Sequence, residues 1–277
     1  MPILHAIVLG IVQGLTEFLP ISSSGHLILV PELFGWNELT SDPELNKTFD
    51  VALHIGTFVG VAWYFRRDIV RYIRAAFRSL RHRAIDDVDE RIAWLLLLSA
   101  VPGAIVGALL NDFIDEELGR PILIGVMLIV FALVLQVADR LPATREADGF
   151  GLRDAALMGM AQALALQPGV SRAGATISMG RWLRFDREAA TRLSFLMSLP
   201  IIAGAALFET VDVMAGGGIE SDLVAPFVWG MVTAAVSGFF AVAWLLRILR
   251  THSFTPFVIY RVLLGATVIV VFATGAR

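Results

Sequence analysis

Long apolar stretches with few charges dominate the chain. Six of them approach the roughly 20 residues that a helix needs to cross a bilayer, although the first is short for a complete span. They are residues 49–65, 92–110, 121–138, 190–208, 224–246 and 256–274. This pattern predicts an all-α polytopic membrane protein with about six transmembrane helices, forming a single integral membrane domain over residues 1–277.

Two other apolar stretches, one opening each half of the chain, are too short or too interrupted to cross. Each leads into a break with Pro, Ser and Gly, and then into a second short apolar piece. The pairs are 3–19 with 27–34 and 155–167 with 175–183. Such a pattern at membrane depth is typical of a re-entrant helix hairpin, which needs protein or a watery cavity to cover it. Eight full spans are the alternative, but Pro20 and Pro168 stand where the hairpins need a break.

The two hairpins are related by a constant offset of 149 positions. Gly10, Gln13, Leu15, Ser22 and Gly25 recur as Gly159, Gln162, Leu164, Ser171 and Gly174. Three predicted spans, an odd number, separate the hairpins, so the halves would have opposite topologies. We therefore expect an inverted-topology repeat, approximately 1–138 and 150–277, with the binding residues meeting near the membrane midplane.

Charged residues between the spans predict the orientation. Arginines gather in the segments 66–91, 139–189 and 247–255, whereas 111–120 and 209–223 are mainly acidic. The excess of arginine places the first three segments on the cytoplasmic side. We expect a site reached from the periplasmic side, with both termini on that side and the polar segment 31–48 at the cavity rim.

Composition supports the membrane assignment and excludes other classes. The chain is 57% hydrophobic and 17% charged, with a mean hydropathy of +0.73, whereas soluble domains carry about 25% charged residues. The absence of cysteine excludes disulfides and thiolate metal sites. A net charge of −3 gives no reason to expect a nucleic-acid partner.

Gln13 and Glu17 are candidate functional residues of the first hairpin. They are four positions apart and so share a helix face. An ionisable residue at membrane depth is costly and is a functional candidate by default, although a neighbouring backbone or arginine could simply hold it. Oxygen ligands suit Mg²⁺ or Ca²⁺, so the pair could bind a metal, or Glu17 could act as an acid or base.

The turn after this helix contains Ser22, Ser23, Ser24, Gly25 and His26. One of the serines could be a helix N-cap. A serine beside a histidine base is also the minimal activated nucleophile.

The break of the second hairpin has the residues of an anion site. Gly169, Ser171, Arg172, Gly174 and Thr176 lead into a short helix, whose N-terminal amides can bind anions. The Arg172 guanidinium suits phosphate oxygens, with a snorkelling surface arginine as the alternative. By the 149 offset, Arg172 stands opposite Ser23. In the spans, His54 could line the site or only bond within the bundle, and Arg261 could pair or snorkel.

These motifs together resemble a known family. The pattern [E/Q]-x-x-x-E, then F-L-P-x-S-S-x-G-H, and P-G-x-S-R-x-x-x-T in the second half, is similar to the undecaprenyl-diphosphatases of the bacitracin-resistance type, over nearly the whole chain. Gln13 is allowed by the pattern, whereas Ala173 stands where serine often follows the arginine. The resemblance implies an enzyme of the bacterial inner membrane that hydrolyses undecaprenyl diphosphate to undecaprenyl phosphate and inorganic phosphate. It would recycle the lipid carrier for peptidoglycan synthesis and confer bacitracin resistance.

The resemblance also implies an inverted repeat with re-entrant helices and a divalent cation, Mg²⁺ or Ca²⁺, held by Gln13 and Glu17. The expected chemistry is phosphoryl transfer, which depends on positioning and charge neutralisation. Ser23 is the expected nucleophile, with Ser22 or water as alternatives and His26 as acid or base. The residues expected to bind the diphosphate are Ser22, Gly169, Ser171, Arg172, Gly174 and Thr176.

The expected partners are a polyprenyl diphosphate, membrane lipid and, as an option, a second copy of the chain in a homodimer. An inverted-repeat transporter or flippase for a phosphorylated lipid is the alternative function. A non-catalytic scaffold would leave Glu17 and Arg172 at membrane depth unexplained.

Overall fold

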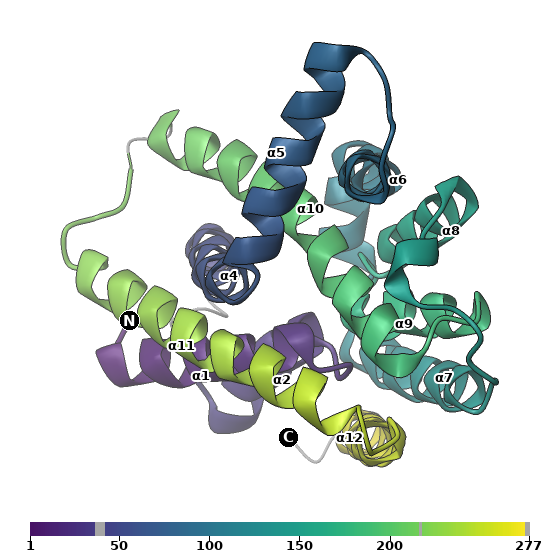
Figure 1. The fold of residues 1–277 in the computed structure, drawn as a ribbon. Helices are drawn as coiled ribbons and strands as arrows, with labels where there is room; N and C mark the ends of the chain where they lie inside the picture. Colours follow the sequence, from purple (N-terminus) through teal and green to yellow (C-terminus); the bar gives the residue numbers. More distant parts are fainter. Residues whose placement is uncertain (37–41, 216–217, 275–277) are drawn as a thin grey trace.

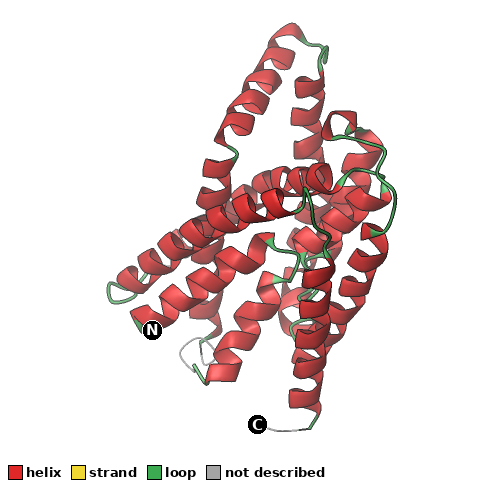
Figure 2. Ribbon diagram, turned by 60° about the horizontal axis from the view of Figure 1, so that its bottom comes forward, coloured by secondary structure: helices red, strands yellow, loops and turns green. Residues whose placement is uncertain are grey.

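The structure, a computed structural model, describes residues 1–36, 42–215 and 218–274, and these residues are mainly helical (Figures 1 and 2). The α-helices are α1 (Ile3–Phe18), α2 (Ser23–Phe34), α4 (Pro43–Tyr64), α5 (Arg66–His82), α6 (Val88–Glu117), α7 (Pro121–Asp139), α8 (Leu152–Leu164), α9 (Arg172–Trp182), α10 (Arg187–Ala215), α11 (Val224–Ile248) and α12 (Thr255–Ala273), with a 3-10 turn, η1 (Ala147–Gly149). In these ranges the β structure is limited to an isolated bridge between Arg145 and Phe185.

The long helices confirm the prediction of a polytopic membrane protein. Five are long and apolar enough to cross a membrane: α7, α11, α12, the Val88–Leu110 part of α6 and the Arg187–Phe208 part of α10. Helices α4 and α5 form a sixth candidate if the bent pair is counted as one span, with 83° between the two parts. Helix α4 begins at Pro43, earlier than predicted, and its 22 residues are about 33 Å long, which matches the thickness of the bilayer core by length alone.

Two segments between the predicted spans are partly helical, so the prediction of loops there is wrong in part. Residues 66–82 of the basic segment form helix α5, because their apolar side chains recur every three or four positions. The acidic segment that starts at position 111 continues α6, after a non-helical residue at Leu110. Of the polar segment predicted at the cavity rim, residues 37–41 lie outside the described residues, and 43–48 belong to α4.

Helices from the two halves pack across each other. Helix α1 lies along α11, α8 lies along α6, and α12 lies along α7. Figure 1 shows α9 among α7, α8 and α10, which are its packing neighbours. Small residues allow the closest approaches: a Cβ on Gly60 of α4 would lie 2.3 Å from the carbonyl oxygen of Ala235 in α11.

Both predicted breaks are present, with the same backbone feature. Helix α1 ends at Phe18 and α2 begins at Ser23, while α8 ends at Leu164 and α9 begins at Arg172. Just before the second helix of each pair, Ser22 has φ 74° and Ser171 has φ 71°. A positive φ is uncommon outside glycine, so the 149 offset of the sequence coincides with a shared, strained backbone conformation.

Candidate active site

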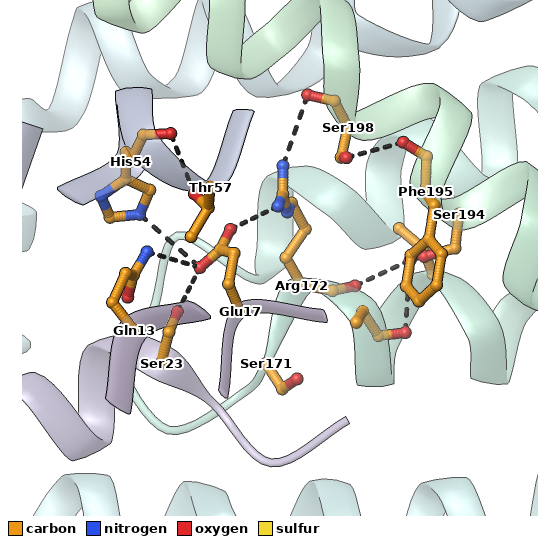
Figure 3. Close-up of polar contacts among 12 residues, drawn as sticks. Gln13, Glu17, Ser23, His54, Thr57, Ser171, Arg172, Ser194, Phe195 and Ser198 are labelled. Carbon is orange, nitrogen blue, oxygen red and sulfur yellow. Dashed lines mark hydrogen bonds and ion pairs between the residues drawn. The ribbon is translucent and has the colours of Figure 1, made fainter. Parts of the chain in front are cut away.

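Glu17 is the centre of a cluster that joins the two breaks (Figure 3). It lies in the last turn of α1 and is only 7% exposed. Its Oε2 atom accepts hydrogen bonds from Ser23 Oγ and, at 3.2 Å, from Gln13 Nε2. His54 Nε2 of α4 lies 3.7 Å from the same oxygen. The carboxylate is therefore held by groups from α1, α2 and α4.

Arg172 approaches Glu17 from the other half of the chain. Its Nη2 atom donates to Glu17 Oε1, and its Nη1 atom reaches the Ser198 carbonyl oxygen of α10 at 3.5 Å. Figure 3 shows Glu17 between Arg172 on one side and Gln13, Ser23 and His54 on the other. The ion pair supplies a compensating charge, without which a buried carboxylate is costly. The surface-snorkelling alternative for Arg172 is therefore wrong.

Ser22 connects the breaks by a second contact. Its Oγ atom accepts a hydrogen bond from the backbone N–H of Gly169 at 3.1 Å, and Ser22 is 1% exposed. Gly169 has φ +92°, and a Cβ there would lie 2.6 Å from the carbonyl oxygen of Ile124. Only glycine fits this close approach without displacement. Ser22 and Gly169 thus fix how the two breaks face each other.

Arg261 of α12 is fully buried beneath both breaks. Its guanidinium donates to the carbonyl oxygens of Pro20 in the first break and of Gly169 and Val170 in the second, at 2.8–3.1 Å. A fourth bond reaches the Leu128 carbonyl oxygen of α7 at 3.2 Å. Snorkelling, one of the two sequence-based alternatives, is therefore wrong. The arginine instead satisfies carbonyl groups that the interrupted helices leave unpaired.

His26 does not join the Glu17 cluster in this structure. Its Nδ1 atom lies 2.6 Å from the Ser22 carbonyl oxygen, and its Nε2 atom lies 2.7 Å from the Tyr260 hydroxyl. A carbonyl oxygen can only accept, so Nδ1 carries the proton and the neutral ring accepts from Tyr260 at Nε2. The expected pairing of His26 with Ser23 is absent among the described contacts, where Glu17 is the partner of the Ser23 hydroxyl.

The remaining predicted residues of α9 have different surroundings. The Ser171 hydroxyl caps the helix by accepting from the Gly174 N–H at 3.1 Å. A Cβ on Gly174 would lie 2.7 Å from the Arg261 guanidinium. Thr176 is fully buried and bonds to the Arg172 carbonyl oxygen and to the Ser194 hydroxyl of α10. Ser171 is near the expected anion site, whereas Thr176 supports helix packing.

A cavity of about 320 Å³ lies beside this cluster. Its polar lining comes from both halves and consists of Glu17, Ser22, Ser23, Ser24, His54, Gln162, Ser171 and Arg172. Its apolar lining consists of Val51, Ala165, Leu166, Ile201, Ile202, Ala205 and Ala206. A headgroup with several oxygens would meet the polar side, and an attached hydrocarbon would meet the apolar side.

The fit of a divalent cation depends on Gln13 and Glu17. The Oε1 atom of Gln13 is buried without a hydrogen-bond partner, although its amide nitrogen bonds to Glu17. Among the described residues, no group of three or more His, Cys, Asp or Glu could form a complete protein cage. One carboxylate and one free amide oxygen suit Mg²⁺, which usually keeps water and substrate phosphate oxygens among its ligands.

The arrangement supports nucleophilic or base chemistry on an anionic substrate. Glu17 accepts from the Ser23 hydroxyl, which is the relation of a general base to a nucleophile. Arg172 presents a planar donor group beside it and is well suited to phosphate oxygens. Together, the fold and this cluster define a polytopic membrane protein with a polar site of glutamate, arginine and serine at the meeting point of two interrupted helix pairs.

Comparison with known proteins identifies the family. A family described as "Bacitracin resistance protein BacA" matches residues 6–267, and the chain belongs to it. This confirms the resemblance inferred from the motifs.

Relatives align over nearly the whole chain. One from Nocardioides sp., named undecaprenyl-diphosphatase, is 48% identical over 98% of this chain and 97% of its own length. Proteins of the same name from Pelobacter propionicus and Geobacter sulfurreducens are each 47% identical. The first covers 99% of both chains, and the second covers 97% of this chain and 98% of its own.

Sequence reasoning did not select Gln162 as a site residue, and it left Arg261 and His54 open. Gln162 lines the cavity, and its Oε1 atom is buried without a partner. The signal was present, because the 149 offset pairs it with Gln13. Arg261 had only its position in an apolar span as a signal. His54 was left undecided, and its ring faces Glu17.

Proposed function

We propose that the chain hydrolyses undecaprenyl diphosphate to undecaprenyl phosphate and inorganic phosphate, and thereby recycles the lipid carrier for peptidoglycan synthesis. Family membership and relatives named undecaprenyl-diphosphatase support this activity. The single structural observation that carries it is the chain of contacts Arg172–Glu17–Ser23, which sets a guanidinium, a base and a hydroxyl around one cavity. The family description names bacitracin resistance, which we expect this activity to confer.

The residues suggest the following sequence of steps. The diphosphate accepts hydrogen bonds from the Arg172 guanidinium, which then bonds less fully to Glu17. Its remaining oxygens lie on the side of the cavity that Ser24 and Ser171 line. Glu17 accepts the proton of Ser23, and Ser23 Oγ attacks the terminal phosphorus. The bond from this phosphorus to the bridging oxygen breaks, and undecaprenyl phosphate leaves with the electron pair. Water then hydrolyses the phosphoserine and releases inorganic phosphate. Direct attack by water stays an alternative.

Gln13 and Glu17 would hold a divalent cation, Mg²⁺ or Ca²⁺. The support is the unpartnered Oε1 atom of Gln13 beside the Glu17 carboxylate. When bound, the cation would supply positive charge to the diphosphate. Removal by EDTA should then abolish turnover, with recovery on adding either metal, and wild-type turnover in EDTA would contradict the requirement.

The finer architecture is also a proposal. We infer an inverted repeat of about 1–138 and 150–277 with two re-entrant hairpins, α1–α2 and α8–α9. Its support is the matching positive φ at Ser22 and Ser171 and the reciprocal packing of α1 on α11 and α8 on α6. The arginine-rich segments support a cytoplasmic-membrane protein whose site opens to the periplasm. A homodimer is an additional proposal, which the mass of the protein in detergent would test.

The test is the release of orthophosphate from undecaprenyl diphosphate by purified protein. Ser23→Ala should reduce the rate strongly and remove any acid-stable phosphoserine trapped from labelled substrate. Ser253→Ala is the control, because this serine bonds to Thr255 at the start of α12 and does not line the cavity. Full activity in Ser23→Ala would move the nucleophilic role to Ser22 or water. Transport of the lipid without phosphate release would instead support the flippase alternative.

A further inference from the structure

Helix α5 (Arg66–His82) carries three different faces. Tyr72, Ala75 and Ser79 are buried, and the Ser79 hydroxyl accepts from Trp94 of α6 at 2.8 Å. A second stripe is apolar and exposed by 43–69%. It consists of Val70, Ile73, Phe77 and Leu80. A third stripe is a row of exposed arginines, namely Arg67, Arg71, Arg74, Arg78 and Arg81.

The two exposed stripes each run along the helix. Their members are spaced by three or four positions, so each forms one continuous face. Arg71 and Arg78 have acidic partners. In the described parts of the chain, Arg67, Arg74 and Arg81 form no ion pair. Helix α5 therefore offers an unpartnered apolar face beside unpaired positive charge.

The start of α5 indicates its depth in the bilayer. Trp63, at the end of α4, is 64% exposed, and the Arg66 guanidinium lies 5.1 Å from its ring centre. An exposed Trp at the end of a span is typical of the lipid–water interface. The 83° bend sets α5 nearly at right angles to α4 (Figure 1). If α4 crosses the bilayer, α5 therefore runs along the membrane surface from the end of α4.

We propose that α5 is a membrane-surface helix that binds anionic phospholipid. Its apolar stripe enters the acyl region of the leaflet, and its arginine row lies at the level of the lipid phosphates. This arrangement is that of an interfacial amphipathic helix, and the row of arginines is complementary to anionic headgroups. The surface is separate from the Glu17 cavity, so the proposal does not depend on the phosphatase activity.

Spin labels on single cysteines of the full-length protein in liposomes test the depth, because the natural chain has no cysteine. A label at Phe77→Cys should collide mainly with dissolved oxygen, and one at Arg74→Cys mainly with a water-soluble nickel chelate. Equal exposure of both labels to the nickel chelate would overturn the proposal, since α5 would then face water and suit a soluble protein partner.

The lipid preference is tested by purifying the protein from bilayers that mix phosphatidylcholine and phosphatidylglycerol. The measurement is the amount of phosphatidylglycerol that stays bound to the protein. Arg74→Gln with Arg81→Gln should reduce retention, with about a fivefold loss of affinity for each arginine. The matched control is Arg140→Gln with Arg153→Gln, which removes the same charge from exposed sites outside α5. Unchanged retention in the α5 variant, or an equal loss in the control, would overturn the proposal.

Discussion

The Glu17 carboxylate accepts hydrogen bonds from a serine hydroxyl, a glutamine amide and an arginine, so one side chain has several proposed roles. Its Oε2 atom faces Ser23 and Gln13, and its Oε1 atom faces Arg172. The two carboxylate oxygens therefore have different proposed roles. Oε2 faces Ser23, the proposed nucleophile, and Oε1 faces Arg172, which is proposed to bind the anion. A substitution that keeps the shape but removes the charge tests both duties at once.

Glu17→Gln should lower the rate of phosphate release by about 10²–10⁴-fold, the usual contribution of a general base. The amide cannot accept the Ser23 proton, and it leaves Arg172 without its ion pair. Orthophosphate release by purified protein is the measurement, with exposed Glu146→Gln as the control. Wild-type rates in Glu17→Gln would remove this residue from the mechanism.

Arg172→Lys should lower turnover by about 10²–10³-fold, the range found for losing one donor to a developing charge. Lysine keeps the positive charge but cannot contact Glu17 and the Ser198 carbonyl with a planar, forked group. Steady-state kinetics compare it with Arg153→Lys, an exposed control. If lysine supports near-normal turnover, the site needs only charge there and the geometric argument is wrong.

Arg261 is a positioning residue because its contacts are to the backbone of both breaks. Arg261→Ala should lower turnover and thermal stability together, since buried carbonyls that lose their partners cost about 1–3 kcal/mol each. Added methylguanidinium should restore part of the turnover by occupying the vacated space. An Arg261→Ala variant with an unchanged Tm and normal turnover would contradict the positioning role.

At the scale of helices, packing depends on small residues where α4 crosses α11. Gly60 has no room for a side chain, because a Cβ would meet the Ala235 carbonyl carbon and oxygen. Gly204 of α10, by contrast, has no described atom within 4 Å of where its Cβ would stand. These two helical glycines therefore form a matched pair.

Gly60→Ala should destabilise the protein by about 1–3 kcal/mol through overpacking. Gly204→Ala should be neutral or stabilising by up to about 1 kcal/mol, because alanine has the higher helix propensity. Thermal unfolding in detergent measures both. Equal Tm values for the two variants would show that α4 and α11 are not so closely packed.

At the scale of the whole molecule, the arginine-rich segments and the cavity define a proposed direction across the membrane. Helix α5 and the segment after it would lie on the cytoplasmic side. The start of α4 and the segment before α11 would then lie on the periplasmic side, close to the proposed entrance. Each side offers exposed positions for a chemical probe.

A membrane-impermeant thiol reagent applied to whole cells should label Glu44→Cys and Gly218→Cys, and should spare Ala84→Cys. All three positions are exposed in the structure, so protection of Ala84→Cys would reflect its side of the membrane. Asn37 and Gly217, which the loop pattern also suggests, lie outside the described residues. Labelling only at 84 would invert the proposed topology and the access to the site together.

The sequence by itself determined the membrane class, the approximate spans, the two breaks and most of the cluster. Long apolar runs, prolines and the 149 offset are local or periodic signals, and they need no knowledge of contacts. Gln13, Glu17, Ser23 and Arg172 could be selected because polar residues at membrane depth are costly and rarely incidental.

Only the tertiary structure decided which of these residues meet. It paired Ser23 with Glu17 and turned His26 toward Tyr260, because the direction of a side chain depends on backbone angles that spacing does not specify. It also placed Arg261 under both breaks, a contact between segments more than 90 residues apart. Which carbonyls an interrupted helix leaves unpaired, and which distant donor reaches them, follows from packing in three dimensions.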